Sequence, residues 1–266
     1  MEWKPPMRSS FLCDKVARKG MVISMKRTFS MDKYYAHRGL HDENFPENSL
    51  GAFRNAIAHG IGVEFDVLKT ADDVLVVFHD DTLQRMCGVQ GRVTESTYHE
   101  LRQLRLKDST EYIPTLEEVL SLIDGKIPLI IEIKSEGDWK KTTKLLAKRL
   151  ERYEGEFVIE SFHPFVLNLY RKLQPETIRG QLSNGLFCKK DTHNLLTQFL
   201  ASKMFLNVFS RPDFIAFKWQ NRSCFCFHFW TKIMHKYPVA WTVRHKEEIK
   251  KIEKDFKSFI FEGFLP

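Results

Sequence analysis

At 266 residues, with 43% hydrophobic and 13% aromatic content, the chain is long enough to bury one substantial core as a single domain. Its longest apolar runs fall far short of the roughly 20 residues of a membrane helix, which argues against a transmembrane protein. The five cysteines are scattered, without the spacing of a zinc site or a disulfide framework, so we expect a protein of the reducing cytoplasm.

The formal net charge of +7 is concentrated near the N-terminus. Residues 1–33 contain eight basic and three acidic side chains, so the rest of the chain is close to neutral. We therefore expect a basic N-terminal extension over residues 1–33 and a folded domain over residues 34–266. The near-neutral domain argues against nucleic-acid binding. The extension is best explained as a solvated tail, with peripheral contact to anionic membrane lipid as the less favoured alternative.

From residue 34 onward, short β-type runs alternate with amphipathic stretches, as in a parallel sheet with helices packed outside it. Helices are expected over Asn48–His59 and over Thr115–Ile123, where Thr115 and Glu118 have the spacing of a capping box. Eight strand-and-helix units predict an α/β fold, a (β/α)₈ barrel. The expected strands are Tyr34–His37, Gly62–Leu68, Pro128–Lys134, Phe157–Ser161, Ile178–Leu182, Phe214–Lys218, Val239–Val243 and Ser258–Glu262.

A ninth β-type run, Val74–Phe78, breaks this alternation. Only Lys69–Asp73 separates it from the preceding strand, which is too short for the crossover that parallel neighbours need. The run must therefore return as a hairpin, so we expect a small insertion after the second strand, from residue 70 to about residue 113. The hairpin would also bring His79 back beside Asp66 at the rim of the barrel.

Polar side chains at the C-terminal ends of barrel strands are the natural candidates for chemistry. The first strand ends in His37, followed by Arg38, which can fork onto phosphate oxygens, and by Gly39, which permits a sharp turn beside a ligand. By itself the histidine is weak evidence, because a strand-end imidazole often only satisfies a loop carbonyl.

Two carboxylates on one strand and a third on the next indicate a metal site. Glu64 and Asp66 are two residues apart and point to the same face, where their charges would repel one another. Glu132 lies between branched apolar residues on the following strand, with Lys134 on the same face. One hard divalent cation, Mg²⁺ or Ca²⁺ and with Mn²⁺ as a further candidate, would resolve the repulsion. The alternatives are exposed or Arg-paired carboxylates and a structural Glu132–Lys134 pair.

The two histidines complete a candidate catalytic set. If His37 and His79 face one phosphoryl group, one imidazole can take the proton of the nucleophile while the other protonates the leaving oxygen. Both roles suit histidine, whose ordinary pKa is close to neutral. The residue types together therefore favour metal-dependent cleavage of a phosphodiester.

Five short motifs resemble the glycerophosphodiester phosphodiesterase family, and the similarity runs from about Tyr34 to the end of the chain. The resemblance implies a TIM barrel with a small insertion after the second strand, which hydrolyses glycerophosphodiesters to sn-glycerol 3-phosphate and an alcohol. The motifs are His37-Arg38-Gly39, Pro46-Glu47-Asn48-Ser49, Glu64-Phe65-Asp66, His79-Asp80 and Glu132-Ile133-Lys134.

The resemblance also assigns roles to individual residues. It implies His37 and His79 as general acid and base, and it suggests that Gln181 and Trp241 point toward the pocket. The chain departs from the family at Arg244, where relatives commonly have asparagine, and in a final strand that contains Glu262 instead of a frequent Thr-Asp pattern. We expect these departures to affect the alcohol moiety and to leave the chemistry intact. The resemblance also implies that Glu64, Asp66 and Glu132 are the metal ligands and that Arg38 and Lys134 contact the phosphate.

Three functions follow from these patterns. Hydrolysis of glycerophosphodiesters is favoured, a lysophospholipase D-like activity is the alternative within the same fold, and a non-catalytic protein that binds phosphate ligands or anionic membrane is the third. The Phe-rich segment Phe225–Trp230 is expected to pack in the core, whereas aromatic side chains exposed at the pocket rim would favour a lipid substrate.

Overall fold

The computed structural model describes residues 31–185, 204 and 206–266. Nearly all of the predicted basic extension, and with it the prediction of a solvated or membrane-contacting tail, lies outside the described residues. Residues 31–266 form one compact unit.

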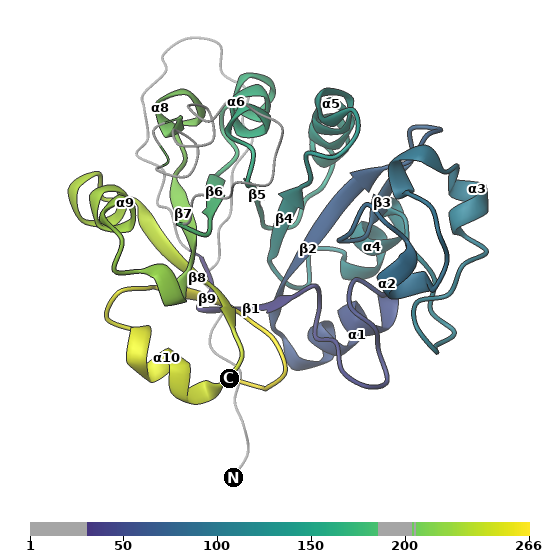
Figure 1. Ribbon diagram of the computed structural model, residues 1–266, viewed down its shortest axis with the longest axis horizontal. Helices are drawn as coiled ribbons and strands as arrows, with labels where there is room; N and C mark the ends of the chain where they lie inside the picture. Colours follow the sequence, from purple (N-terminus) through teal and green to yellow (C-terminus); the bar gives the residue numbers. More distant parts are fainter. Residues whose placement is uncertain (1–30, 186–203, 205) are drawn as a thin grey trace. The chain divides into compact units, whose positions relative to one another are not determined.

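Eight parallel strands close into a barrel (Figure 1). Each strand pairs with the next along the chain, and the barrel closes because the first strand pairs in parallel with both the second and the last. The predicted (β/α)₈ fold is therefore confirmed. The barrel strands are β1 (Tyr34–His37), β2 (Gly62–Lys69), β4 (Leu129–Ile133), β5 (Phe157–Ser161), β6 (Arg179–Ser183), β7 (Phe214–Lys218), β8 (Tyr237–Val243) and β9 (Ser258–Phe261).

Helices surround the barrel, and most of them bury an apolar face against it (Figure 1). Their starts follow local sequence signals: the Ser49 side chain accepts a hydrogen bond from the Ala52 amide, and Thr115 and Glu118 form the predicted capping box. Among the described residues, no helix is long and apolar enough to cross a lipid bilayer. The outer helices are α1 (Leu50–His59), α4 (Leu116–Ile123), α5 (Trp139–Leu150), α6 (Pro164–Leu173), α8 (Asn207–Ser210), α9 (Phe225–His228) and α10 (Lys246–Ile252).

The segment between β2 and α4 folds beside the barrel with a small core of its own. It contains β3 (Leu75–Val77), α2 (Gln84–Cys87) and α3 (Tyr98–Leu101). Strand β3 pairs antiparallel with β2, so the predicted hairpin return is confirmed. Because the Phe78 amide donates to the Asp66 carbonyl at 3.1 Å, the chain delivers the next residue, His79, to the C-terminal rim of β2.

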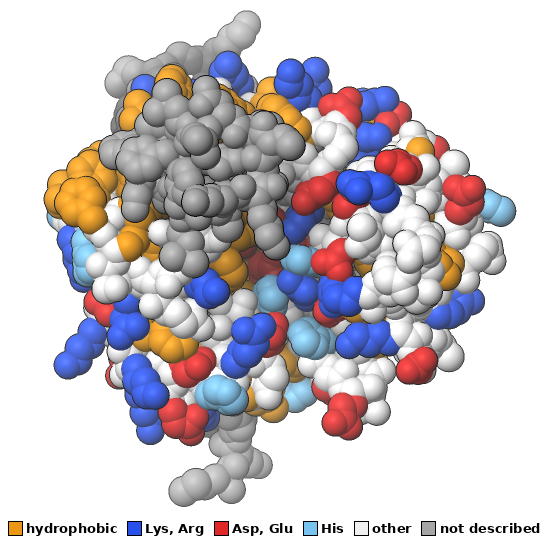
Figure 2. Space-filling view, in the orientation of Figure 1, with side chains coloured by type: hydrophobic (Ala, Val, Ile, Leu, Met, Phe, Trp, Pro, Cys, Tyr) orange, Lys and Arg blue, Asp and Glu red, His pale blue; other side chains and the backbone are white. Residues whose placement is uncertain are grey.

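The Phe-rich segment divides between core and surface. Phe227 and Trp230 are buried against the barrel, as core packing predicts. Phe225 is 75% exposed, and Figure 2 shows hydrophobic side chains gathered on the surface over α9. The segment does not line the pocket described below, so it says little about substrate.

Candidate active site

Acidic, basic and histidine side chains gather around a hollow on the face of the molecule shown in Figure 2. The hollow is a pocket of about 290 Å³ at the C-terminal end of the barrel. This is the end at which barrel enzymes carry their active sites, because the loops that follow the strands meet there. The pocket is lined by His37, Arg38, Glu64, His79, Glu132, Glu160, Phe162, Leu182, Lys218, Gln220, Trp241, Thr242, Arg244 and Ile260.

The three predicted carboxylates converge. Glu64 and Asp66 point into the barrel from β2, and Glu132 is the register partner of Asp66 on β4. One oxygen atom from each of the three lies within 4.8 Å of the others, and all three side chains are buried. The pairing register of two adjacent strands therefore places three oxygen donors around one point.

The nearby cations do not offset the charge of this cluster. Lys134 Nζ lies 3.2 Å from Glu132 Oε1 and 3.5 Å from Asp66 Oδ1. Burial raises the pKa of Glu64 well above its ordinary value and that of Glu132 to about 7, whereas Lys134, His79 and Arg38 overcome the effect of burial at Asp66 and lower its pKa. A buried site that brings three oxygen donors together and disfavours the ionisation of two of them, Glu64 and Glu132, fits a hard divalent cation such as Mg²⁺ or Ca²⁺.

Cation binding should weaken as the pH falls through about 7. Below the raised pKa of Glu132 and Glu64, these carboxyl groups carry protons that a cation must displace. The folded cation-free protein binds these protons more tightly than the unfolded chain, so the contribution of these two groups to its stability falls as the pH rises toward 7. In thermal melting, saturating Mg²⁺ or Ca²⁺ should raise Tm by more at about pH 8 than at about pH 6. An equal rise at both pH values would contradict this prediction.

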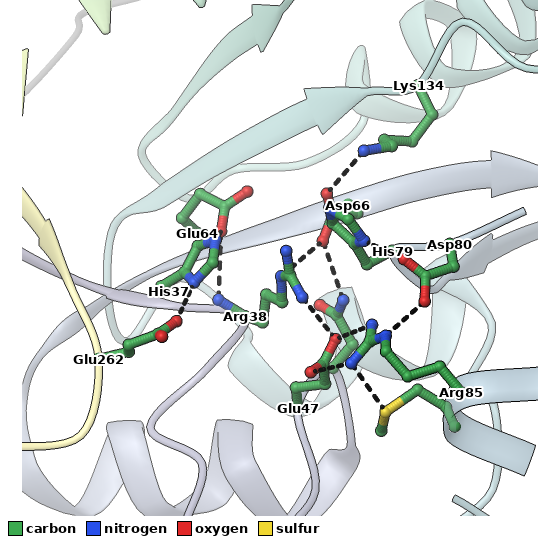
Figure 3. Close-up of polar contacts among 12 residues, drawn as sticks. His37, Arg38, Glu47, Glu64, Asp66, His79, Asp80, Arg85, Lys134 and Glu262 are labelled. Carbon is green, nitrogen blue, oxygen red and sulfur yellow. Dashed lines mark hydrogen bonds and ion pairs between the residues drawn. The ribbon is translucent and has the colours of Figure 1, made fainter. Parts of the chain in front are cut away.

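The position of His37 is fixed by the backbone at the end of β1 and by the carboxylate of Glu262. A sharp turn follows it: Gly39 has φ +82°, and a Cβ there would lie 2.9 Å from that of Ala52. The Nδ1 atom of His37 lies 2.5 Å from Glu262 Oε2, which leaves Nε2 facing Glu64 at 4.0 Å (Figure 3). Burial lowers the pKa of His37, and the carboxylate opposes this effect. The ring therefore presents Nε2 to the pocket.

His79 is held in the same way from the opposite side. Its Nδ1 lies 2.5 Å from Asp80 Oδ1, and burial again lowers the pKa of the imidazole. The other oxygen of Asp80 accepts a hydrogen bond from Arg85, just as the other oxygen of Glu262 accepts one from Arg244 at 2.7 Å. Each histidine thus has a carboxylate on Nδ1 that is itself bound by an arginine.

A network of ion pairs connects the first barrel loop to the segment that carries His79 (Figure 3). Glu47 accepts hydrogen bonds from Arg38 at 2.7 Å and from Arg85 at 2.8 Å. Burial alone would raise the pKa of Glu47, but the two arginines outweigh it and lower the pKa to about 2. The Asn48 side chain donates to Asp66 at 3.0 Å. The two histidine-bearing segments are therefore fixed relative to each other and to the carboxylate cluster.

The sequence profile of the glycerophosphoryl diester phosphodiesterase family matches residues 37–256, which include both histidines, the carboxylate cluster and the ion-pair network around Glu47. The chain belongs to this family. It is 34% identical over 175 residues to a glycerophosphodiester phosphodiesterase from Bacillus altitudinis, a match that spans 61% of this chain and 71% of that protein. It is 32% identical over 277 residues to glycerophosphodiester phosphodiesterase 1 of Bos taurus, across 86% of this chain and 77% of that protein.

Solved structures of this family share the fold. A phosphodiesterase from Oleispira antarctica, solved in complex with the product sn-glycerol-3-phosphate, superposes with a TM-score of 0.71 at 23% sequence identity. The match covers 86% of this chain and 92% of that one. At this level of identity the likeness establishes the barrel fold alone.

One residue predicted to face the pocket does not. Trp241 lines the pocket wall, but the carboxamide of Gln181 donates to the backbone carbonyls of Ser161, Phe162 and Leu182. Because side chains alternate along a strand, Leu182 faces the pocket where Gln181 does not. The prediction for Gln181 is therefore wrong. Its side chain instead links β6 to the C-terminal end of β5 through these hydrogen bonds.

Sequence reasoning also misjudged Glu262 and missed Glu160. The departure at Glu262 was expected to affect only the alcohol moiety, but the structure places this carboxylate on His37, with Arg244 on its other oxygen. Glu160 lines the pocket from β5, next to Glu132 in register. Its signal was present in the sequence, since it interrupts an apolar strand as Glu132 does.

Proposed function

We propose that this member of the family is a divalent-metal-dependent phosphodiesterase that hydrolyses glycerophosphodiesters to sn-glycerol 3-phosphate and an alcohol. The observation that carries the proposal is the placement of two histidines, each held through Nδ1, around one pocket beside three convergent carboxylates, of which Glu64 and Glu132 line the pocket. The names of the relatives support the same substrate class.

His37 and His79 serve as the acid and base pair. A carboxylate on Nδ1 fixes the proton on that atom, so each ring keeps Nε2 for proton transfer. One ring takes a proton from the attacking water as the water oxygen forms the new P–O bond. The other gives a proton to the alcohol oxygen as its bond to phosphorus breaks, so that the leaving group departs as a neutral alcohol.

Glu64, Asp66 and Glu132 are the proposed ligands of the cation, which would polarise the phosphoryl oxygens when bound. Arg38 is the proposed phosphate contact of the chain itself, because its guanidinium group lines the pocket beside the carboxylate cluster, with Nε 3.7 Å from Asp66 Oδ2. Lys134 adds positive charge on the other side of Asp66. These groups orient the phosphodiester between the two imidazoles.

One observation favours lysophospholipids as a second substrate class. Phe162 is 43% exposed at the pocket wall, and its ring packs edge-to-face on Trp241 with centroids 5.5 Å apart. Aromatic side chains at a rim suit an acyl chain as well as a small alcohol. The non-catalytic alternative has less support, because a phosphate-binding protein has no need for two histidines held in this way.

The proposed activity is tested by incubating the purified chain with glycerophosphocholine and either Mg²⁺ or Ca²⁺ and measuring the sn-glycerol 3-phosphate released. Product that requires the cation supports the proposal. If lysophosphatidylcholine is cleaved and glycerophosphocholine is not, the lysophospholipase D alternative replaces it. No cleavage of either substrate with Mg²⁺, Ca²⁺ or Mn²⁺ would favour the non-catalytic alternative.

A further inference from the structure

A further carboxyl group, that of Glu160, lines the pocket without belonging to the carboxylate cluster. Glu160 is the register partner of Glu132 on β5, so Asp66, Glu132 and Glu160 form one row across three adjacent strands. Its side chain is 1% exposed and lines the pocket. Glu160 nevertheless falls outside the group of convergent oxygen atoms that fits a cation.

Among the described residues, none forms a hydrogen bond with the buried Oε2 of Glu160. On the far side from Glu132, the register partner of Glu160 is Gly180, and the Phe214 ring fills the space where a β6 side chain would stand, so close that a Cβ on Gly180 would lie 2.0 Å from it. An apolar ring cannot satisfy a carboxyl group. Since buried polar atoms are nearly always hydrogen-bonded, a partner from the pocket is expected.

We propose that Glu160 binds the free hydroxyl groups of the glycerol moiety and so selects glycerophosphodiesters over other phosphodiesters. The inference rests on the proposed function and identifies Glu160 as the side chain that recognises the glycerol part of the substrate. A carboxyl group repels phosphoryl oxygens but accepts hydrogen bonds from hydroxyls, and the glycerol moiety carries two of them. The phosphate itself has Arg38 and the carboxylate-bound cation as partners.

The depth of Glu160 distinguishes the glycerol moiety from the leaving alcohol. Glu160 is almost fully buried, whereas Phe162, two residues further along the chain, is 43% exposed at the pocket wall. The glycerol moiety is common to all substrates of the proposed reaction and suits the buried, polar end of the pocket. The alcohol varies and suits the exposed, aromatic end.

The test compares two ligands that share a phosphate group and differ in the glycerol. Binding of sn-glycerol 3-phosphate and of inorganic phosphate is measured by calorimetry with saturating Mg²⁺, in the wild type and in Glu160→Gln and Glu160→Ala. We expect Glu160→Ala to weaken sn-glycerol 3-phosphate binding by about 10-fold or more, Glu160→Gln to weaken it less, and phosphate binding to change by less than about twofold. Glu156→Gln, an exposed residue just before the same strand, is the matched control and should change neither.

The outcomes separate this inference from the proposed function. If the wild type hydrolyses glycerophosphocholine but both Glu160 variants bind sn-glycerol 3-phosphate normally, the inference alone is overturned. If binding of both ligands and of Mg²⁺ weakens together, Glu160 is a cation ligand, and the inference is again overturned. A wild type that neither hydrolyses the diester nor binds either ligand overturns the proposed function and this inference with it. Glu160→Gln preserves side-chain volume, and its melting temperature shows whether the variant is folded.

Discussion

Replacing either His37 or His79 with alanine should lower kcat for glycerophosphocholine by about 10²-fold or more, the loss typical of removing a general acid or base. Both rings line the pocket and are held at Nδ1 by different carboxylates, so neither can substitute for the other. Binding of sn-glycerol 3-phosphate should change far less, because the imidazoles act on proton transfer. Steady-state kinetics and product-binding measurements on the same variants check both expectations.

His99→Ala is the matched control, since His99 is exposed on α3 and does not line the pocket. It should retain wild-type kcat. A His37 or His79 variant that keeps more than about a tenth of wild-type kcat would remove that histidine from its proposed role.

The second large effect is expected from Glu64→Gln, which should weaken binding of Mg²⁺ or Ca²⁺ by about 10-fold or more, because all-oxygen sites depend on the number of charged ligands. A change at Glu64 is easier to interpret than one at Asp66. The Glu64 side chain accepts a hydrogen bond from the Arg38 amide, which a glutamine oxygen can still accept, whereas Asp66 lies against Lys134 and Arg38 and accepts a hydrogen bond from Asn48. Activity should recover in part at high cation concentration. A cation titration followed by activity and by calorimetry measures the change.

Removal of a buried acid can also change stability, so the Glu64 variant needs two controls. Glu156→Gln makes the same chemical change at an exposed position and should leave the titration unaltered. The melting temperature of Glu64→Gln without cation should be at least that of the wild type, because burial raises the pKa of Glu64 and disfavours its charge. An unaltered cation titration in Glu64→Gln would show that Glu64 is not a ligand.

Local sequence patterns were sufficient to predict the barrel. The eight predicted strands differ from the observed ones by no more than two residues at either end, because buried parallel strands are short apolar runs bounded by polar loops. Hairpin geometry alone predicted that β3 would return beside β2 and bring His79 to Asp66. The alternation of side chains along β2 and β4 predicted that Glu64, Asp66 and Glu132 would meet.

The residues that sequence reasoning missed depend on contacts between distant segments. Glu262 and His37 are separated by most of the chain, and only closure of the barrel by β9 and β1 brings them together. Gln181 could not be assigned to one face without the register of β6, because a shift by one residue reverses the direction of every side chain. Glu160 was different: its apolar strand carried the same signal as that of Glu132, and the pattern was sufficient to find it.

If one cation and one phosphate group lie between His37 and His79, anomalous diffraction should locate both. Crystals grown with Mn²⁺ and sn-glycerol 3-phosphate should show a single strong anomalous peak within coordination distance of Glu64, Asp66 and Glu132. The phosphate of the ligand should lie beside that peak, with Nε2 of both histidines facing it. A peak elsewhere in the molecule, or a phosphate bound away from either imidazole, would contradict the proposed function.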